Sequence, residues 1–165
     1  RRTIGFVFQD ADDQLFMPTV KEDVAFGPLN FGVPAEEAAS LAATALDVVG
    51  ASHLAERPPY HLSGGEKRAV ALAGVIAMGP SVLLLDEPTA GLDPAARRRL
   101  IKLLQAFEHT RIVATHDLDL VLDVCTRVLV MEGGRIVADG APDAVFRDEP
   151  LLARCHLEAP LRWQG

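Results

Sequence analysis

Apolar residues along this chain recur with two different spacings, which predict both strands and helices. Short runs rich in Val, Ile, Leu and Phe are typical of β-strands. Five such runs occur, at residues 3–8, 82–86, 111–115, 127–131 and 135–138. Residues 19–79 carry almost no strand signal, and apolar positions recur there at helical spacing. The pattern therefore predicts a long helical segment between the first and second strands.

Capping residues mark the ends of several predicted helices. Thr19 and Glu22 have the spacing of a capping box, which predicts a helix over 20–26 that stops at Gly27-Pro28. A second helix ends at Gly50. This helix is expected to bury Leu41, Ala45, Leu46, Val48 and Val49. Further helices are predicted from about residue 65 to 79, over 94–107, over 118–124 and from 142, whereas the pattern fades after 150.

The length, charge and cysteine content of the chain argue against several classes of protein. A length of 165 residues allows one domain with its own core. The 16 basic and 23 acidic residues give a net charge of −7, which argues against a nucleic-acid partner because such binders present a basic face. Cys125 and Cys155 are isolated, so neither a disulfide framework nor a zinc site is expected, in keeping with a reducing cytosol. No apolar run reaches the roughly 18 residues that cross a bilayer, and Arg1 and Arg2 precede a strand-like run, not a signal peptide.

Three short motifs lie close together between Leu62 and Asp93. The first, Ser63-Gly64-Gly65-Glu66, opens a predicted helix, whose free N–H groups and dipole favour an anion such as phosphate. The second is an apolar run that ends in Asp86 and Glu87, typical of a buried parallel strand with its chemistry at the carboxyl end. The third is a Gly-containing turn closed by Asp93, an N-cap candidate. Each motif alone is usually a plain turn or a solvated loop, so only the combination points to function.

In this order, the motifs strongly resemble those of the ABC-type ATPase domain, with LSGGE as signature motif, VLLLDE as Walker B and the segment to Asp93 as D-loop. Gln9 and His116 stand where that family carries its Q-loop glutamine and switch histidine. The resemblance implies an α/β, P-loop NTPase-like (ABC/RecA-like) fold with a mostly parallel sheet and an inserted helical subdomain. It divides the chain into a partial RecA-like core (1–18 and 80–140), a helical signature subdomain (19–79) and a C-terminal helical tail (141–165).

A nucleotide-hydrolysing ABC domain also needs a P-loop, G-x-x-x-x-G-K-[ST]. The lysines, Lys21, Lys67 and Lys102, do not follow a glycine, so this sequence contains no P-loop. In the family that loop lies upstream of the Q-loop glutamine. We therefore expect an N-terminally truncated domain that alone neither binds ATP tightly nor hydrolyses it. We also expect open edges on strands 111–115 and 127–131, because the family's P-loop strand lies between them.

The resemblance assigns roles to individual residues, with ATP and Mg²⁺ as cofactors. Glu87 is the expected general base, and His116 the expected contact to the γ-phosphate. Asp86 and Gln9 are the expected ligands of the nucleotide-bound Mg²⁺. The remaining expected nucleotide-binding residues, which act across a homo- or heterodimer with a second ABC ATPase domain, are Ser63, Gly64, Gly65, Glu66 and Asp93.

The segment after Gln9 indicates a subfamily and a membrane partner. Ala11-Asp12-Asp13-Gln14 resembles the Pro-Asp-x-Gln pattern of energy-coupling-factor ATPases, with Ala in the place of the proline. That resemblance implies a peripheral protein at the cytoplasmic face of the membrane that powers uptake of cobalt or nickel ions, or of vitamins. Its expected contact with a transmembrane coupling subunit is the region from Gln9 to Phe31.

Two other classes stay open on the sequence. One is a soluble ABC ATPase of DNA repair or chromosome organisation, which the acidic charge and the short Gln9-to-Ser63 spacing disfavour. The other is a non-catalytic interaction module, which the missing P-loop favours for this chain taken alone.

Overall fold

The structure is a computed structural model that describes residues 3–164. Residues up to Ala114 form one compact unit and residues from Thr115 onward form a second, so the two are described separately. The predicted division into core, signature subdomain and tail stays a prediction, and its ends at residues 1, 2 and 165 lie outside the described residues.

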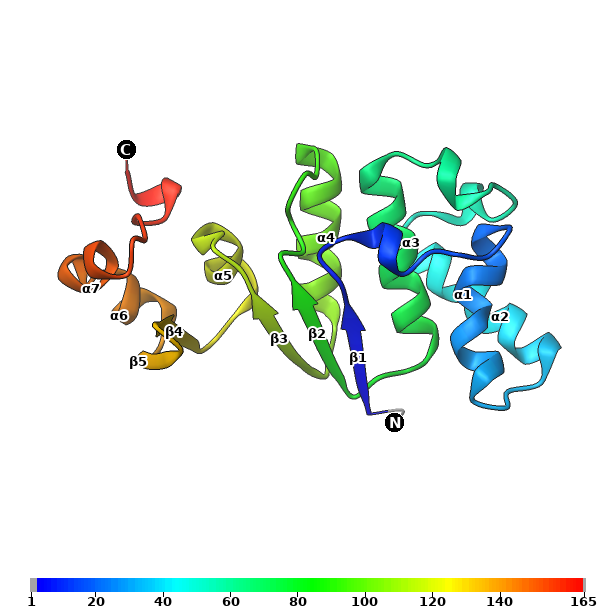
Figure 1. Cartoon of the computed structure of the whole chain (residues 1–165), viewed down its shortest axis with the longest axis horizontal. Coiled ribbons are helices and arrows are strands. Elements are labelled where there is room, and N and C mark those ends of the chain that lie inside the picture. The colour runs from blue at the N-terminus through cyan, green and yellow to red at the C-terminus, as the bar shows by residue number, and fades with distance from the viewer. Residues whose placement is uncertain (1–2, 165) are drawn as a thin grey trace. The chain divides into compact units, whose positions relative to one another are not determined.

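The first unit contains a parallel sheet, with α1, α2 and α3 on the side of β1 (Figure 1). Its strands are β1 (Ile4–Val7), β2 (Val82–Asp86) and β3 (Thr110–Ala114), in the order β1-β2-β3. This arrangement confirms the first three predicted strands and their parallel pairing. Gly5 leaves room for helix α3, because a Cβ at that position would lie 2.3 Å from Val75.

Three helices lie between β1 and β2 in the sequence and pack on one another in the structure. They are α1 (Val20–Asn30), α2 (Ala35–Val48) and α3 (Gly64–Ala77). Helix α1 does not stop at Gly27-Pro28 as predicted but continues through Pro28. A proline clashes mainly with the Cβ and N–H of the residue before it, and Gly27 has no Cβ. Gly50 has the left-handed φ of +72° that the predicted C-cap requires.

The apolar face predicted for α2 was only partly correct. The helix buries Ala38, Ala42, Ala45 and Leu46, whereas Leu41 and Val48 are exposed. Small alanines let α2 approach α1 and α3 closely, so the buried stripe is shifted from the larger residues. Helix α4 (Pro94–Ala106) begins as predicted, with the Asp93 carboxylate accepting hydrogen bonds from the N–H groups of Ala95 and Ala96 at 2.8 and 2.9 Å.

The second unit contains α5 (Leu118–Val124), the antiparallel pair β4 (Val128–Glu132) and β5 (Arg135–Gly140), α6 (Pro142–Phe146) and α7 (Glu149–Arg154). Gly133 and Gly134, both with positive φ, form the predicted hairpin turn. Helix α7 lies where the pattern was interpreted as fading. Its start is marked by Asp148, whose carboxylate accepts a hydrogen bond from the Leu151 N–H at 3.0 Å.

The last strand of the parallel sheet, β3, has no buried residue. Ile112 in β3 is 55% exposed. Among residues 3–164, β3 is hydrogen-bonded to β2 only, and β4 to β5 only. No helix within this range is both long enough and apolar enough to span a bilayer.

Candidate functional site

The N-terminus of α3 is built by a complete capping box. The Glu66 carboxylate accepts hydrogen bonds from the Ser63 N–H and Oγ, both at 2.8 Å, and Ser63 Oγ accepts one from the Glu66 N–H at 3.4 Å. The backbone bond from Ser63, followed by the bond from its hydroxyl, lowers the pKa of Glu66. A Cβ on Gly64 would meet no atom within 4 Å, so a ligand can approach this backbone closely. The predicted anion-binding helix start therefore has the required shape.

The carboxyl end of β2 turns sharply after Asp86. Glu87 has a φ of +42°, which side chains other than glycine rarely adopt. Its N–H donates to Ala114 O at 2.9 Å, and its carbonyl accepts from the Ala90 N–H at 3.1 Å. Such backbone strain costs about 1–3 kcal/mol and persists where surrounding contacts impose it, often at functional sites.

Two basic residues of α3 hold the loop that follows β1. Lys67 forms an ion pair with Asp12 at 2.5 Å. Arg68 donates through Nη2 to Gln9 O at 2.5 Å and through Nη1 to Glu87 O at 2.6 Å. The loop is also closed by Gln14, whose Oε1 accepts from the Phe8 N–H at 2.8 Å. Sequence reasoning missed Arg68, because its acceptors are backbone carbonyls that no residue pattern reveals.

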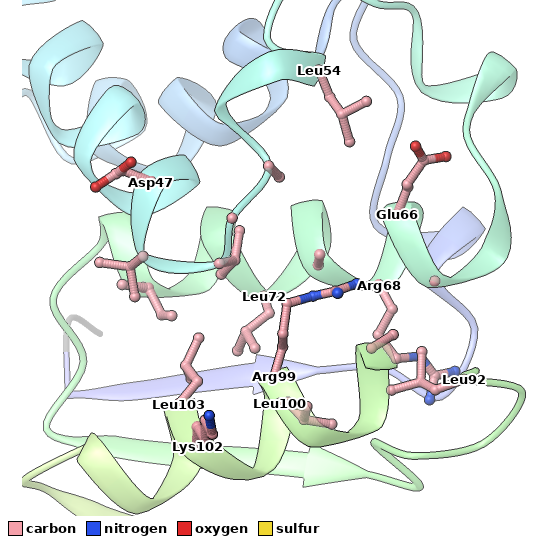
Figure 2. A pocket seen from close by; sticks show the side chains of 18 of the residues that line it. Asp47, Leu54, Glu66, Arg68, Leu72, Leu92, Arg99, Leu100, Lys102 and Leu103 are labelled. Atoms are coloured by element: carbon pink, nitrogen blue, oxygen red, sulfur yellow. The ribbon is translucent and has the colours of Figure 1, made fainter. Parts of the chain in front are cut away.

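The predicted nucleotide-binding residues line two separate hollows. Gln9, Gly64 and Asp86 line one cavity of about 680 Å³, together with the acidic loop 10–13. The others line a groove of about 640 Å³ between α2, α3 and α4, which is also lined by Leu72 of α3 and by Leu100 and Leu103 of α4 (Figure 2). These others are Ser63, Gly65, Glu66 and Asp93. His116 belongs to the second unit, which is described by itself, so its role stays a prediction.

The donor set beside the first cavity fits a magnesium ion. Mg²⁺ prefers oxygen ligands and is usually held by one or two carboxylates plus substrate phosphates. Asp86 supplies a carboxylate and Gln9 an amide oxygen on the same cavity. The described part of the chain contains no cluster of three or more His, Cys, Asp or Glu residues arranged for a metal.

A third hollow, of about 260 Å³, lies between α1, α3 and the segment before α1. Phe16 on its rim is 62% exposed and contacts Phe26 edge to face, with ring centroids 4.8 Å apart. Asp23 lies beneath, and its Oδ1 accepts hydrogen bonds from the N–H groups of Phe16 and Met17 at 3.0 and 3.1 Å. Burial raises the pKa of Asp23, although the two backbone bonds lower it.

Together, the parallel sheet, the carboxylates at the end of β2 and the capped helix α3 define an α/β domain of the nucleotide-hydrolase class. Residues 10–123 match the family model described as "AAA domain, putative AbiEii toxin, Type IV TA system". A "Putative ABC transporter ATP-binding protein" of Geobacter sulfurreducens is 57% identical over the whole chain, and one of Gloeobacter violaceus is 54% identical over 98% of it. EcfA, an energy-coupling factor transporter ATP-binding protein of Methanocaldococcus jannaschii, is 49% identical over 97%. The chain belongs to the family of ABC transporter ATP-binding proteins.

Solved structures agree with this assignment. The cbiO1 protein of Clostridium perfringens, part of the ABC transporter complex cbiONQ, aligns over 93% of this chain and 63% of its own length, with a TM-score of 0.80 and 44% identity. A dimeric ATP-binding cassette in a post-hydrolysis state with ADP and Pi aligns over 86% and 64%, with a TM-score of 0.75 and 29% identity. Of the three relatives above, this chain spans 66%, 67% and 58% of their length.

Proposed function

We propose that this chain is part of the ATP-hydrolysing subunit of an ABC importer that takes up cobalt or nickel ions, or a vitamin. The observation that carries the proposal is that Gln9 and Asp86, the two candidate magnesium ligands, line the same cavity. The likeness to EcfA and to cbiO1 of the cbiONQ complex supports an importer of the energy-coupling type.

In this proposal Glu87 is the general base. Its carboxylate, which directly follows strand β2, accepts the proton of an attacking water. Asp86 and Gln9 would hold Mg²⁺, which when bound would neutralise charge that develops on the phosphates. Ser63, Gly64, Gly65, Glu66 and Asp93 contact nucleotide on a second ATPase domain, and His116 contacts the γ-phosphate.

The test of the catalytic role is Glu87→Gln in the full-length protein. The amide keeps the shape of the side chain but cannot accept the proton, so hydrolysis should fall by at least about a hundredfold while ATP binding is retained. Steady-state hydrolysis and calorimetric titration with Mg-ATP measure the two quantities. Hydrolysis close to the wild-type rate would exclude Glu87 as the base.

We further propose that the third hollow receives a membrane subunit, which makes the protein peripheral at the cytoplasmic face of the membrane. Exposed Phe16 and Phe26 give it the apolar character of a protein contact. Phe16→Asp should reduce co-purification with the membrane subunit without lowering thermal stability, whereas Tyr60→Asp, at another exposed aromatic, serves as control. Unchanged co-purification of the Phe16 variant contradicts this assignment.

A further inference from the structure

Arg68 joins two segments that are far apart in the sequence. Its guanidinium donates to the Gln9 carbonyl at 2.5 Å and to the Glu87 carbonyl at 2.6 Å. A planar guanidinium presents several donors in a fixed fork, so one side chain can hold two acceptors in a defined relative position. Burial lowers the pKa of Arg68, and the charges of Asp10 and Glu87 oppose that shift. The charged side chain is thus kept in a partly buried place where its hydrogen bonds and the nearby acidic charges offset its desolvation.

The backbone at Glu87 is strained, so hydrogen bonds such as the one from Arg68 are needed to hold it. Glu87 combines a φ of +42° with a following proline, Pro88, which is fully buried. A residue before proline normally adopts an extended conformation. The turn therefore depends on the groups bonded to Glu87, and Arg68 supplies a charged donor among them.

We propose that Arg68 is a positioning residue that fastens both Glu87 and Gln9 to the helix that begins at Ser63. Through it, a displacement of α3 by a ligand at the helix N-terminus shifts the base and the metal-binding loop together. We call the two hydrogen bonds of Arg68, to the Gln9 and Glu87 carbonyls, the Arg68 clamp. The inference rests on the proposed function only for the roles of Glu87 and Gln9, because the clamp itself is a property of the fold.

Lys67 provides a matched comparison. It precedes Arg68 on the same helix and pairs with Asp12, so it holds the same loop without bonding to the Glu87 turn. Arg68→Lys keeps the charge but replaces the fork by one ammonium group, which cannot span both carbonyls as the guanidinium does.

Hydrogen exchange and steady-state kinetics on the full-length protein test the clamp. In Arg68→Ala, exchange should accelerate by about tenfold or more both at 9–14 and at 87–90, because a charged donor is lost from each segment. Lys67→Ala should accelerate exchange at 9–14 only, and Arg68→Lys should restore protection in one segment but not in both. With Glu87 and the metal-binding loop both displaced, kcat should fall at least about tenfold.

Exchange at 87–90 within twofold of wild type in Arg68→Ala overturns the proposal, and so does full protection of both segments in Arg68→Lys. If Arg68→Ala loses protection along the whole chain, the exchange of Arg68→Lys at 9–14 and 87–90 decides whether the proposal holds. A wild-type protein that hydrolyses no ATP refutes the proposed function, yet the exchange pattern still decides whether Arg68 holds the two segments together.

Discussion

Replacing Asp23 by alanine is expected to lower the free energy of unfolding by about 2 kcal/mol. Asp23 is only 8% exposed, and its carboxylate accepts hydrogen bonds from the Phe16 and Met17 N–H groups. A buried donor left without its acceptor costs about 1–3 kcal/mol. Since these two amides are part-buried and can regain some water, the total should lie near the low end of their sum. For a chain of this size, the melting temperature should fall by about 4–8 °C.

The pH dependence of the same site separates its charge from its hydrogen bonds. Burial raises the pKa of Asp23 above its ordinary value of 3.8. A raised pKa in the folded state means that the stability gained from protonation is complete below 3.8 and is lost as the pH rises through the folded value. Asp23→Asn keeps an oxygen acceptor and cannot ionise. The stability of wild type relative to Asp23→Asn should therefore decrease as the pH rises through that window.

Urea denaturation of the full-length protein, followed by far-UV circular dichroism, measures both effects. Fluorescence of Trp163 is unsuitable because this residue lies in the other unit. Asp47→Ala, at an exposed acid of α2, is the control and should stay within about 0.5 kcal/mol of wild type. An Asp23→Ala variant as stable as Asp47→Ala would refute the reasoning, since the two amides would then have found other partners.

Three further outcomes are expected. Ser63→Ala should destabilise the protein by about 1 kcal/mol through loss of a helix cap, measured by thermal unfolding, and Ser63→Thr should recover most of it. Arg162→Ala removes the donors to Asp119 at 2.7 Å and Asp123 at 2.9 Å, so limited proteolysis should cut the segment after Pro160 faster, and unchanged cleavage would contradict this. Residues 1–165 prepared alone should self-associate in sedimentation velocity, because Ile4, Phe6 and Ile112 expose apolar surface on the sheet; a dilute monomer that melts cooperatively would disprove it.

Local signals predicted the elements where the deciding interaction is itself local. The Ser63–Glu66 and Asp93 caps, the Gly50 helix end and the Gly133-Gly134 turn each involve residues within a few positions of one another. Where the deciding contact is distant, the predictions failed. Helix α2 buries alanines rather than Val48, because it packs on α1 and α3. The continuation of α1 through Pro28 is a different failure, since its cause, the missing Cβ of Gly27, is local.

The same reasoning applies within the candidate site. Gln9, Gly64 and Asp86 could be named from motifs, since each motif marks the end of an element and parallel strands place such ends at one edge. Arg68 could not, because its hydrogen bonds go to two carbonyl oxygens whose positions follow only from the tertiary fold.

The apolar residues of the strands do not reveal which face of the sheet is buried. Phe6, Leu84 and Ile112 are register partners, so their side chains share one face of β1, β2 and β3. Phe6 and Ile112 on that face are exposed, whereas Val7 and Leu85 on the opposite face are buried. Strands that are apolar on both faces are typical of parallel sheets covered on both sides. The apolar residues of β1 and β3 are therefore typical of a sheet that is covered on both faces. Phe6 and Ile112 are exposed because the described residues cover only the opposite face, not because their own face is polar.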